Sequence, residues 1–250
     1  MTSHRTLILV LAMLVCVPLR VAVADQSTQP PNAEPARSES VLSDLPLVDV
    51  PAKGDTVRLA VFYSGDGGWA TLDTNVSKRL AEAGVNVIGV NSLRYFWRDR
   101  PPERAAQDLT RILREKLRAR PAGDKVLLIG YSTGADVLPF IVNRLPEDLR
   151  NRIASVNLIA PGHDAVFEIH VRDWIPGSRK KEGLPLMPEI ARFPPPAVLC
   201  LYGEGDKEAL CPELPAEHAT TVLIGEGHHL GGDYDAIAGR ILAFASAKAG

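Results

Sequence analysis

The sequence has little excess of either charge. Its 250 residues include 28 lysines and arginines against 30 aspartates and glutamates, which gives a formal net charge of −2 at pH 7. A nucleic-acid-binding domain usually carries a basic excess on one face, because lysine and arginine supply the attraction to phosphates. We therefore expect no nucleic-acid partner.

The sequence also lacks an apolar run long enough to cross a membrane, which takes about 20 residues. Its N-terminal apolar run, residues 6–14, is soon followed by Pro18 and Arg20. A short basic segment, such an apolar run and then Ala22-Val23-Ala24 is the order found in secretory signal peptides. We expect residues 1–24 to be a signal peptide that is cleaved after Ala24, and the mature protein to be exported and soluble.

Two alternatives remain for this segment: an uncleaved anchor, or the leader of a lipoprotein modified at Cys16, although Val15 is bulky for that cleavage. Beyond it, residues 25–45 are rich in Pro, Ser, Gln and Glu, which predicts a disordered linker. Residues 46–250 are then expected to form one domain, of a size that buries a sizeable core.

Cysteine is scarce as well, with three residues in the chain. Removal of the signal peptide leaves Cys200 and Cys211. Such a pair in an exported protein favours a disulfide bond, because the compartment is oxidising. Two free thiols are the alternative, because the sequence does not determine the geometry that the bond requires.

Strand-like apolar runs alternate with amphipathic helical segments along the domain. This alternation predicts an α/β fold with a mostly parallel sheet and helices on both faces. The expected strands are residues 57–63, 85–90, 126–131, 153–160, 197–202 and 221–224. One connection, residues 161–196, is much longer than is usual in such sheets. We expect a loop insertion there at the carboxyl end of the sheet, where a lid or binding loop would lie. A surface excursion without a role is the alternative.

The most informative pattern is Gly-x-Ser-x-Gly at Gly130, Ser132 and Gly134. By itself it is weak, because many such matches are ordinary turns. Here an apolar strand precedes it and a helical segment follows it, which is the context of a nucleophile elbow. The pattern therefore predicts Ser132 as a catalytic nucleophile.

A serine nucleophile needs a base and a third group that orients the base. In this architecture the expected chain order is Ser, then Asp or Glu, then His. Asp206 and His228 follow the last two expected strands, so both are expected at the edge of the sheet where Ser132 lies. Glu208 is an alternative to Asp206, and the adjacent His229 is an alternative to His228.

Acyl transfer also needs N–H donors for the oxyanion. The glycine-rich loop after the first expected strand suits this role, and we expect the donors to be the N–H groups of Asp66 and Thr133. The loop lacks the Lys-Ser or Lys-Thr of a phosphate-binding loop. His163 and His170 do not have the spacing of zinc ligands. We expect no metal and no cofactor.

Four segments of the domain resemble one known group of proteins. They are residues 62–69 (FYSGDGGW), 92–97 (SLRYFW), 130–132 (GYS) and 167–171 (FEIHV). They are similar to the bacterial virulence protein VirJ and to the C-terminal domain of AcvB, and the resemblance covers nearly all of residues 56–247. It implies an α/β-hydrolase fold in the periplasm, with Ser132 in the position of the family's nucleophile.

The resemblance implies two roles that differ in kind. One is hydrolysis of an aminoacylated phosphatidylglycerol, such as lysyl-phosphatidylglycerol. The other is an accessory or binding role beside a type IV secretion system, without essential catalysis. A fold by itself does not separate the two. The order of the triad candidates favours the enzyme, because an adaptor has no physical need for it.

A lipid of this kind carries a cationic amine near its ester and an anionic phosphodiester beyond it. We expect Trp69, Arg94 and Tyr95 to contact the substrate, with the rings against its apolar parts and the guanidinium against its phosphate. Acids such as Glu168 would face the amine, and core packing is the alternative for each ring. The basic run Arg179–Lys181 suggests peripheral contact with an anionic membrane surface, with a solvated loop as the alternative.

Overall fold

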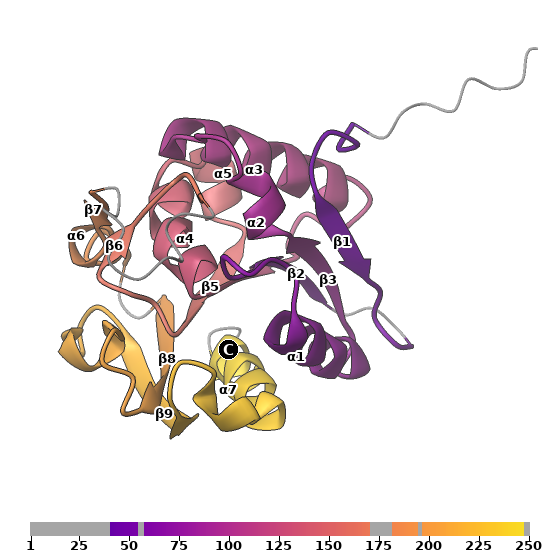
Figure 1. The fold of residues 1–250 in the computed structure, drawn as a ribbon. Coiled ribbons are helices and arrows are strands. Elements are labelled where there is room, and N and C mark those ends of the chain that lie inside the picture. The colour runs from indigo at the N-terminus through magenta and orange to yellow at the C-terminus, as the bar shows by residue number, and fades with distance from the viewer. Residues whose placement is uncertain (1–40, 55–57, 171–181, 195–196, 248–250) are drawn as a thin grey trace, which may run out of the picture. The chain divides into compact units, whose positions relative to one another are not determined.

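A sheet of seven strands runs through the computed structural model, which describes residues 41–54, 58–170, 182–194 and 197–247 (Figure 1). The strand order is β1-β3-β2-β4-β5-β8-β9. The expected signal peptide, residues 25–40 of the expected linker, and Arg179–Lys181 lie outside the described residues.

The strands agree closely with those expected. They are β1 (Leu47–Val50), β2 (Arg58–Tyr63), β3 (Val85–Val90), β4 (Val126–Tyr131), β5 (Ile153–Ile159), β8 (Val198–Glu204) and β9 (Thr220–Glu226). All neighbouring pairs are parallel except β1, which pairs with β3 in the antiparallel sense. The mostly parallel sheet is therefore confirmed. Strand β1 was not expected, because a four-residue edge strand carries almost no periodic signal.

Helices cover both faces of the sheet (Figure 1). Helices α1 (Thr71–Glu82) and α7 (Tyr234–Ala247) lie on one face, and α3 (Pro102–Leu117) and α4 (Thr133–Asn143) lie on the other. The shorter helices are α2 (Ser92–Tyr95), α5 (Glu147–Arg150) and α6 (Met187–Ile190). Two apolar cores result, one on each side of the sheet.

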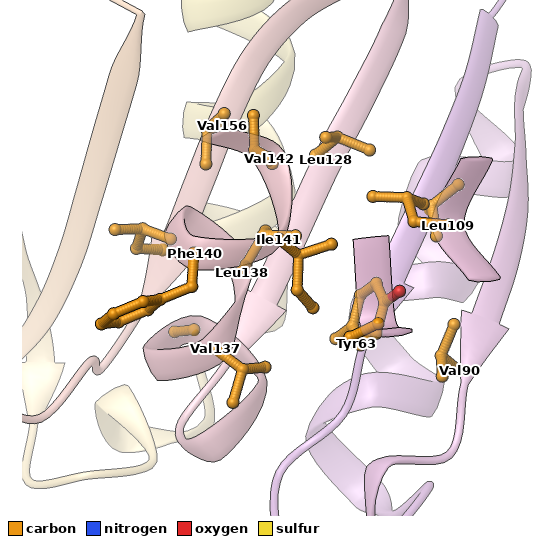
Figure 2. Close-up of a cluster of buried hydrophobic side chains, with 14 of the residues drawn as sticks. Tyr63, Val90, Leu109, Leu128, Val137, Leu138, Phe140, Ile141, Val142 and Val156 are labelled. Atoms are coloured by element: carbon orange, nitrogen blue, oxygen red, sulfur yellow. The ribbon is translucent and has the colours of Figure 1, made fainter. Parts of the chain in front are cut away.

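The alternation of side chains along β2 divides the two cores. Val61 and Tyr63 point toward α3 and α4, whereas Ala60 and Phe62 point toward α1 and α7. Figure 2 shows the first core, where apolar side chains of α4 pack against those of β4 and β5. Because α4 is buried along most of its length, the segment that follows Ser132 is held firmly on the sheet.

The domain begins earlier than expected. Residues 41–45 were expected to belong to the linker, but Leu42 and Leu45 are buried in the core beside α3. The Arg111 guanidinium donates hydrogen bonds to the Asp44 carboxylate and to the carbonyl oxygen of Val41. Two leucines and one ion pair are enough to order this segment, because burial of apolar area offsets the entropy that the ordering costs.

The long insertion is anchored at several points. Strands β6 (Asp164–Ala165) and β7 (Leu184–Pro185) pair in the antiparallel sense. The Ile169 N–H donates to the carbonyl oxygen of Phe96 at 2.8 Å, and the Arg100 N–H donates to the carbonyl oxygen of Phe167 at 3.0 Å. The described part of the insertion is therefore attached to the loop that follows α2.

Candidate active site

Ser132 stands between the end of β4 and the start of α4. Its backbone has φ 52° and ψ −123°, a conformation that a residue with a side chain rarely adopts. Close packing holds this turn, because a Cβ atom on Gly134 would overlap the carbonyl oxygen of Tyr63 in β2. The strained serine is the geometry of a nucleophile elbow.

The three expected triad residues lie in one chain of hydrogen bonds. His228 Nε2 lies 2.9 Å from Ser132 Oγ, and His228 Nδ1 lies 2.9 Å from Asp206 Oδ2. The Asp206 side chain is only 6% exposed, so its charge acts on the imidazole with little screening by water. With Nδ1 donating to Asp206, the neutral imidazole leaves Nε2 as the acceptor for the serine proton.

Asp206 and His228 are held in place by the ends of β8 and β9, which extend beyond the sheet. The Gly227 N–H donates to the carbonyl oxygen of Glu204 at 2.8 Å, so the two strand ends stay paired just before the two side chains. A Cβ atom on Gly203 would overlap the carbonyl oxygen of Gly227. Only glycine at position 203 allows the two loops to approach this closely.

The structure shows which residue of each alternative pair contacts the other members of the triad. It is His228 whose Nε2 contacts Ser132 Oγ, whereas His229 Nδ1 lies 2.6 Å from the hydroxyl group of Tyr131. Glu208 lines the cavity beside Ser132, and its backbone N–H donates to Asp206 Oδ1 at 3.2 Å. It is the Asp206 carboxylate that accepts from the imidazole of His228.

A disulfide bond joins Cys200 in β8 to Cys211, with their Cα atoms 5.6 Å apart. The two cysteines are 11 positions apart, and the loop that they close contains Asp206. A cross-link over a loop of this length stabilises a fold by about 2–4 kcal/mol, chiefly by limiting the unfolded chain. The disulfide thus ties the loop that holds Asp206 to the central sheet.

A cavity of about 800 Å³ opens at Ser132. The insertion supplies much of its lining, and the glycine-rich loop, α4 and the loop after β8 supply most of the rest. Six carboxylate side chains line it: Asp66, Asp136, Asp164, Glu168, Glu182 and Glu208. The basic side chains of the lining are Lys207 and the imidazoles of His163 and His228. Such a cavity favours a cationic ligand group, because the negative field in a low-dielectric site is poorly screened.

Asp136 is the carboxylate that this environment affects most. Burial raises its pKa to about 8, and the nearby charges of Asp66, Asp164 and Glu208 act in the same direction. The Gly162 N–H donates to its Oδ1 at 2.7 Å, which acts in the opposite direction. A cation bound beside Asp136 would favour the ionised form, so the site can accept positive charge by releasing a proton.

Asp66 and Thr133 also line this cavity, as expected for the donors to an oxyanion. Thr133 is the first residue of α4, where backbone N–H groups have no partner within the helix. Gly65, which precedes Asp66, packs against Tyr131 and Ser132. The glycine-rich loop therefore lies directly beside the serine.

The expected substrate contacts are located elsewhere. The ring of Trp69 packs on Gly89 of β3 and against Phe62, beneath α1. Tyr95 is 2% exposed and donates its hydroxyl proton to the buried Asp108 at 2.8 Å. Arg94 is an exposed residue of α2 and is not part of the lining of the cavity at Ser132. Tyr95 therefore takes the core position that was the alternative, and Trp69 is half-buried and packs against the core on the other face of the sheet.

Asp136 and Asp164 were not among the residues that the sequence predicted for the site. For Asp136 a signal existed, because residues i and i+4 share one face of a helix and Asp136 follows Ser132 by one turn. For Asp164 no local pattern pointed to the cavity, because the path of the insertion places it there. In the part of the chain that is described, no group of three or more His, Cys, Asp or Glu side chains is arranged to hold a metal ion.

Solved structures of other proteins share this fold. MenH from S. aureus matches with a TM-score of 0.58 and 14% identity, over 82% of this chain and 99% of its own. Est1E from Butyrivibrio proteoclasticus matches with a TM-score of 0.55 and 13% identity, over 80% and 94%. An esterase from Exiguobacterium antarcticum matches with a TM-score of 0.57 and 11% identity, over 80% and 94%. At such identities the likeness shows the fold alone, which is the α/β-hydrolase fold.

No curated protein matches the sequence. A family model does, and its description is "Bacterial virulence protein (VirJ)", with residues 57–249 matched. The matched range includes the elbow, the loops of Asp206 and His228, and the whole insertion. Because the match extends over most of the chain, this protein belongs to the VirJ family of bacterial virulence proteins.

Proposed function

We propose that this protein is a serine hydrolase that cleaves a carboxylic ester by acyl transfer. The observation that carries the proposal is the chain of hydrogen bonds from Asp206 through His228 to Ser132, at a strained elbow that opens into a cavity. A serine hydroxyl is unreactive at neutral pH without such a base. The strain at Ser132 supports the same conclusion, because strained residues of this kind cluster at active sites.

The reaction would proceed in two steps. Ser132 Oγ attacks the ester carbonyl carbon while His228 Nε2 takes its proton, and the oxyanion is held by the N–H groups of Asp66 and Thr133. Collapse of this intermediate expels the alcohol, which receives the proton from His228. Water, deprotonated by His228, then attacks the acyl-enzyme and releases the acid and Ser132. Asp206 keeps the imidazole in the required tautomer and stabilises its cationic form.

The proposed substrate is an aminoacylated phosphatidylglycerol of the lysyl-phosphatidylglycerol type. The acidic lining of the cavity supports this choice, because the acyl part of such an ester carries ammonium groups and a fatty acyl chain carries none. Membership of the VirJ family supports it through the resemblance described above. We place the reaction in the periplasm because the N-terminal signal segment indicates export and the resemblance to VirJ implies this compartment. No described helix is both long and apolar enough to cross a membrane.

The test is product analysis with purified protein and vesicles that contain lysyl-phosphatidylglycerol. We expect release of free lysine and formation of phosphatidylglycerol, with Ser132→Ala protein as the blank. Release of fatty acid without lysine would indicate a phospholipase. Absence of turnover with lipid and with soluble esters would favour the other role, an accessory protein of a type IV secretion system.

The effect of Asp136→Asn on the stability of the fold tests the acidic lining of the cavity at Ser132. Asparagine keeps an oxygen that accepts from the Gly162 N–H but removes the charge. The wild-type carboxyl has its pKa raised from 3.8 to about 8 in the fold, so its protonation stabilises the folded state. This contribution is complete below pH 4 and is lost as the pH rises toward 8.

We therefore expect Asp136→Asn to raise the melting temperature relative to wild type, with a difference that grows between pH 4 and pH 8 and is constant above. Thermal unfolding over that pH range is the measurement. Asp148→Asn, a change to an exposed carboxylate on α5, is the control. A difference that does not vary with pH would show that Asp136 ionises normally.

A further inference from the structure

A second cavity, of about 500 Å³, lies on the loop that follows β3 and α2. Its lining differs in charge from that of the cavity at Ser132: it consists of Leu93, Arg94, Tyr95, Trp97, Arg98 and Arg100. Three guanidinium groups and no carboxylate contribute to it. Trp97 is 53% exposed, which is unusual for so large an apolar side chain. We refer to the exposed part of this lining, formed by Leu93, Arg94, Trp97 and Arg98, as the Trp97 surface.

The Trp97 surface has a rigid base. The Arg100 guanidinium lies 4.7 Å from the centre of the Tyr95 ring and donates to the buried Asp108 carboxylate at 3.1 Å. Tyr95 donates to the same carboxylate at 2.8 Å. The contacts of Tyr95 and Arg100 with Asp108 therefore fix the loop that carries Trp97 and Arg98, so the exposure of these two residues does not come from a loosely held segment.

Two arginines of this surface are available to a ligand. Among the described residues, the guanidinium groups of Arg94 and Arg98 form no hydrogen bond or ion pair, and both residues are exposed. Arg100, in contrast, is engaged with Asp108 and with the carbonyl oxygen of Tyr95. Charge complementarity thus favours an anionic partner that meets Arg94 and Arg98 together with an exposed indole ring.

One pair of backbone segments links the Trp97 surface to the cavity at Ser132, which we call the acidic cavity. The Ile169 N–H donates to the carbonyl oxygen of Phe96, the residue before Trp97. Glu168 and Ile169 line the acidic cavity. A region of positive charge and a region of negative charge therefore adjoin each other, and this backbone hydrogen bond links the segments that carry them.

We propose that the Trp97 surface docks this protein on a bilayer that contains anionic phospholipid. Trp97 would insert at the level of the headgroups, where indole rings are favoured, and Arg94 and Arg98 would contact lipid phosphates. The docked protein would hold the acidic cavity beside the same leaflet. This last step rests on the proposed function, whereas the docking itself does not.

The experiment measures co-sedimentation of Ser132→Ala protein with vesicles, so that no lipid is consumed. Vesicles of equal parts phosphatidylcholine and phosphatidylglycerol are compared with vesicles of phosphatidylcholine alone. We expect binding to the first only, weakening as salt is added. Arg94→Ala with Arg98→Ala should weaken binding by on the order of 30-fold, since each cation near an anionic surface contributes about fivefold. Trp97→Ala should weaken it further.

Two matched controls distinguish an effect of the Trp97 surface from a general effect of losing positive charge or exposed apolar area. Arg114→Ala with Arg118→Ala removes the same charge from α3 and its end, where both side chains are more than half exposed. Leu223→Ala removes an apolar side chain that is 51% exposed on β9. Both should bind as the parent does. An equal loss of vesicle binding in the control and test variants would overturn the proposal. So would binding that does not depend on phosphatidylglycerol or on salt.

The two proposals fail in different ways. If wild-type protein hydrolyses a soluble aminoacyl ester but the Ser132→Ala protein does not bind the vesicles, only the docking is wrong. If the vesicles are bound through Arg94, Trp97 and Arg98 but no ester is hydrolysed, the docking stands and the proposed function is wrong.

Discussion

Replacing Ser132 with alanine should reduce ester hydrolysis by on the order of 10⁶-fold while leaving the melting temperature nearly unchanged. The large loss follows because Ser132 Oγ is the atom that forms the acyl-enzyme, and no other hydroxyl lies in the chain from Asp206 to His228 among the described contacts. The small effect on stability follows because a strained elbow residue contributes little packing. The alanine variant loses only the hydrogen bond to His228.

The measurements are kcat with a chromogenic ester and the midpoint of thermal unfolding. Labelling with a fluorophosphonate, which reacts with activated serines, should mark wild type and spare Ser132→Ala. Ser246→Ala is the control, because that exposed hydroxyl donates to a carbonyl oxygen within α7, accepts from Arg58 and does not line the cavity at Ser132. Activity retained in purified Ser132→Ala protein would eliminate the serine mechanism.

Replacing His228 with alanine should be about as severe as replacing Ser132, because the members of a triad act as one unit. His228 Nε2 is the atom within 2.9 Å of Ser132 Oγ, so its removal leaves the hydroxyl without a base. The double variant of Ser132 and His228 should be no less active than either single variant. Measurement of kcat/KM with the same ester tests both statements.

His229→Ala is the matched control, since it removes the same side chain one position away. We expect a far smaller loss of activity, because His229 Nδ1 is engaged with the hydroxyl group of Tyr131 and not with Ser132. If His229→Ala is the crippling change instead, the assignment of the base within this adjacent pair is wrong.

Local patterns in the sequence were sufficient to predict the sheet and the nucleophile elbow. The apolar run of β4, the glycines on either side of Ser132 and the start of α4 depend on neighbours within a few residues, and such features survive in a linear pattern. The order of Ser132, Asp206 and His228 was also sufficient to place them at one edge. Because parallel strands end at the same edge of a sheet, strand order alone brings their following loops together.

The sequence by itself determined the α/β architecture and the candidate residues of the triad. The tertiary structure decided which residue of each alternative pair joins the chain of hydrogen bonds to Ser132, since the close approach of Gly203 to Gly227 brings the loop of His228 beside that of Asp206. It also decided that Tyr95 belongs to one core and that Trp69 packs against the other, because their burial depends on segments far away in the chain. The acidic lining at Ser132 is likewise a property of the fold, since the path of the insertion gathers carboxylates from distant positions around one cavity.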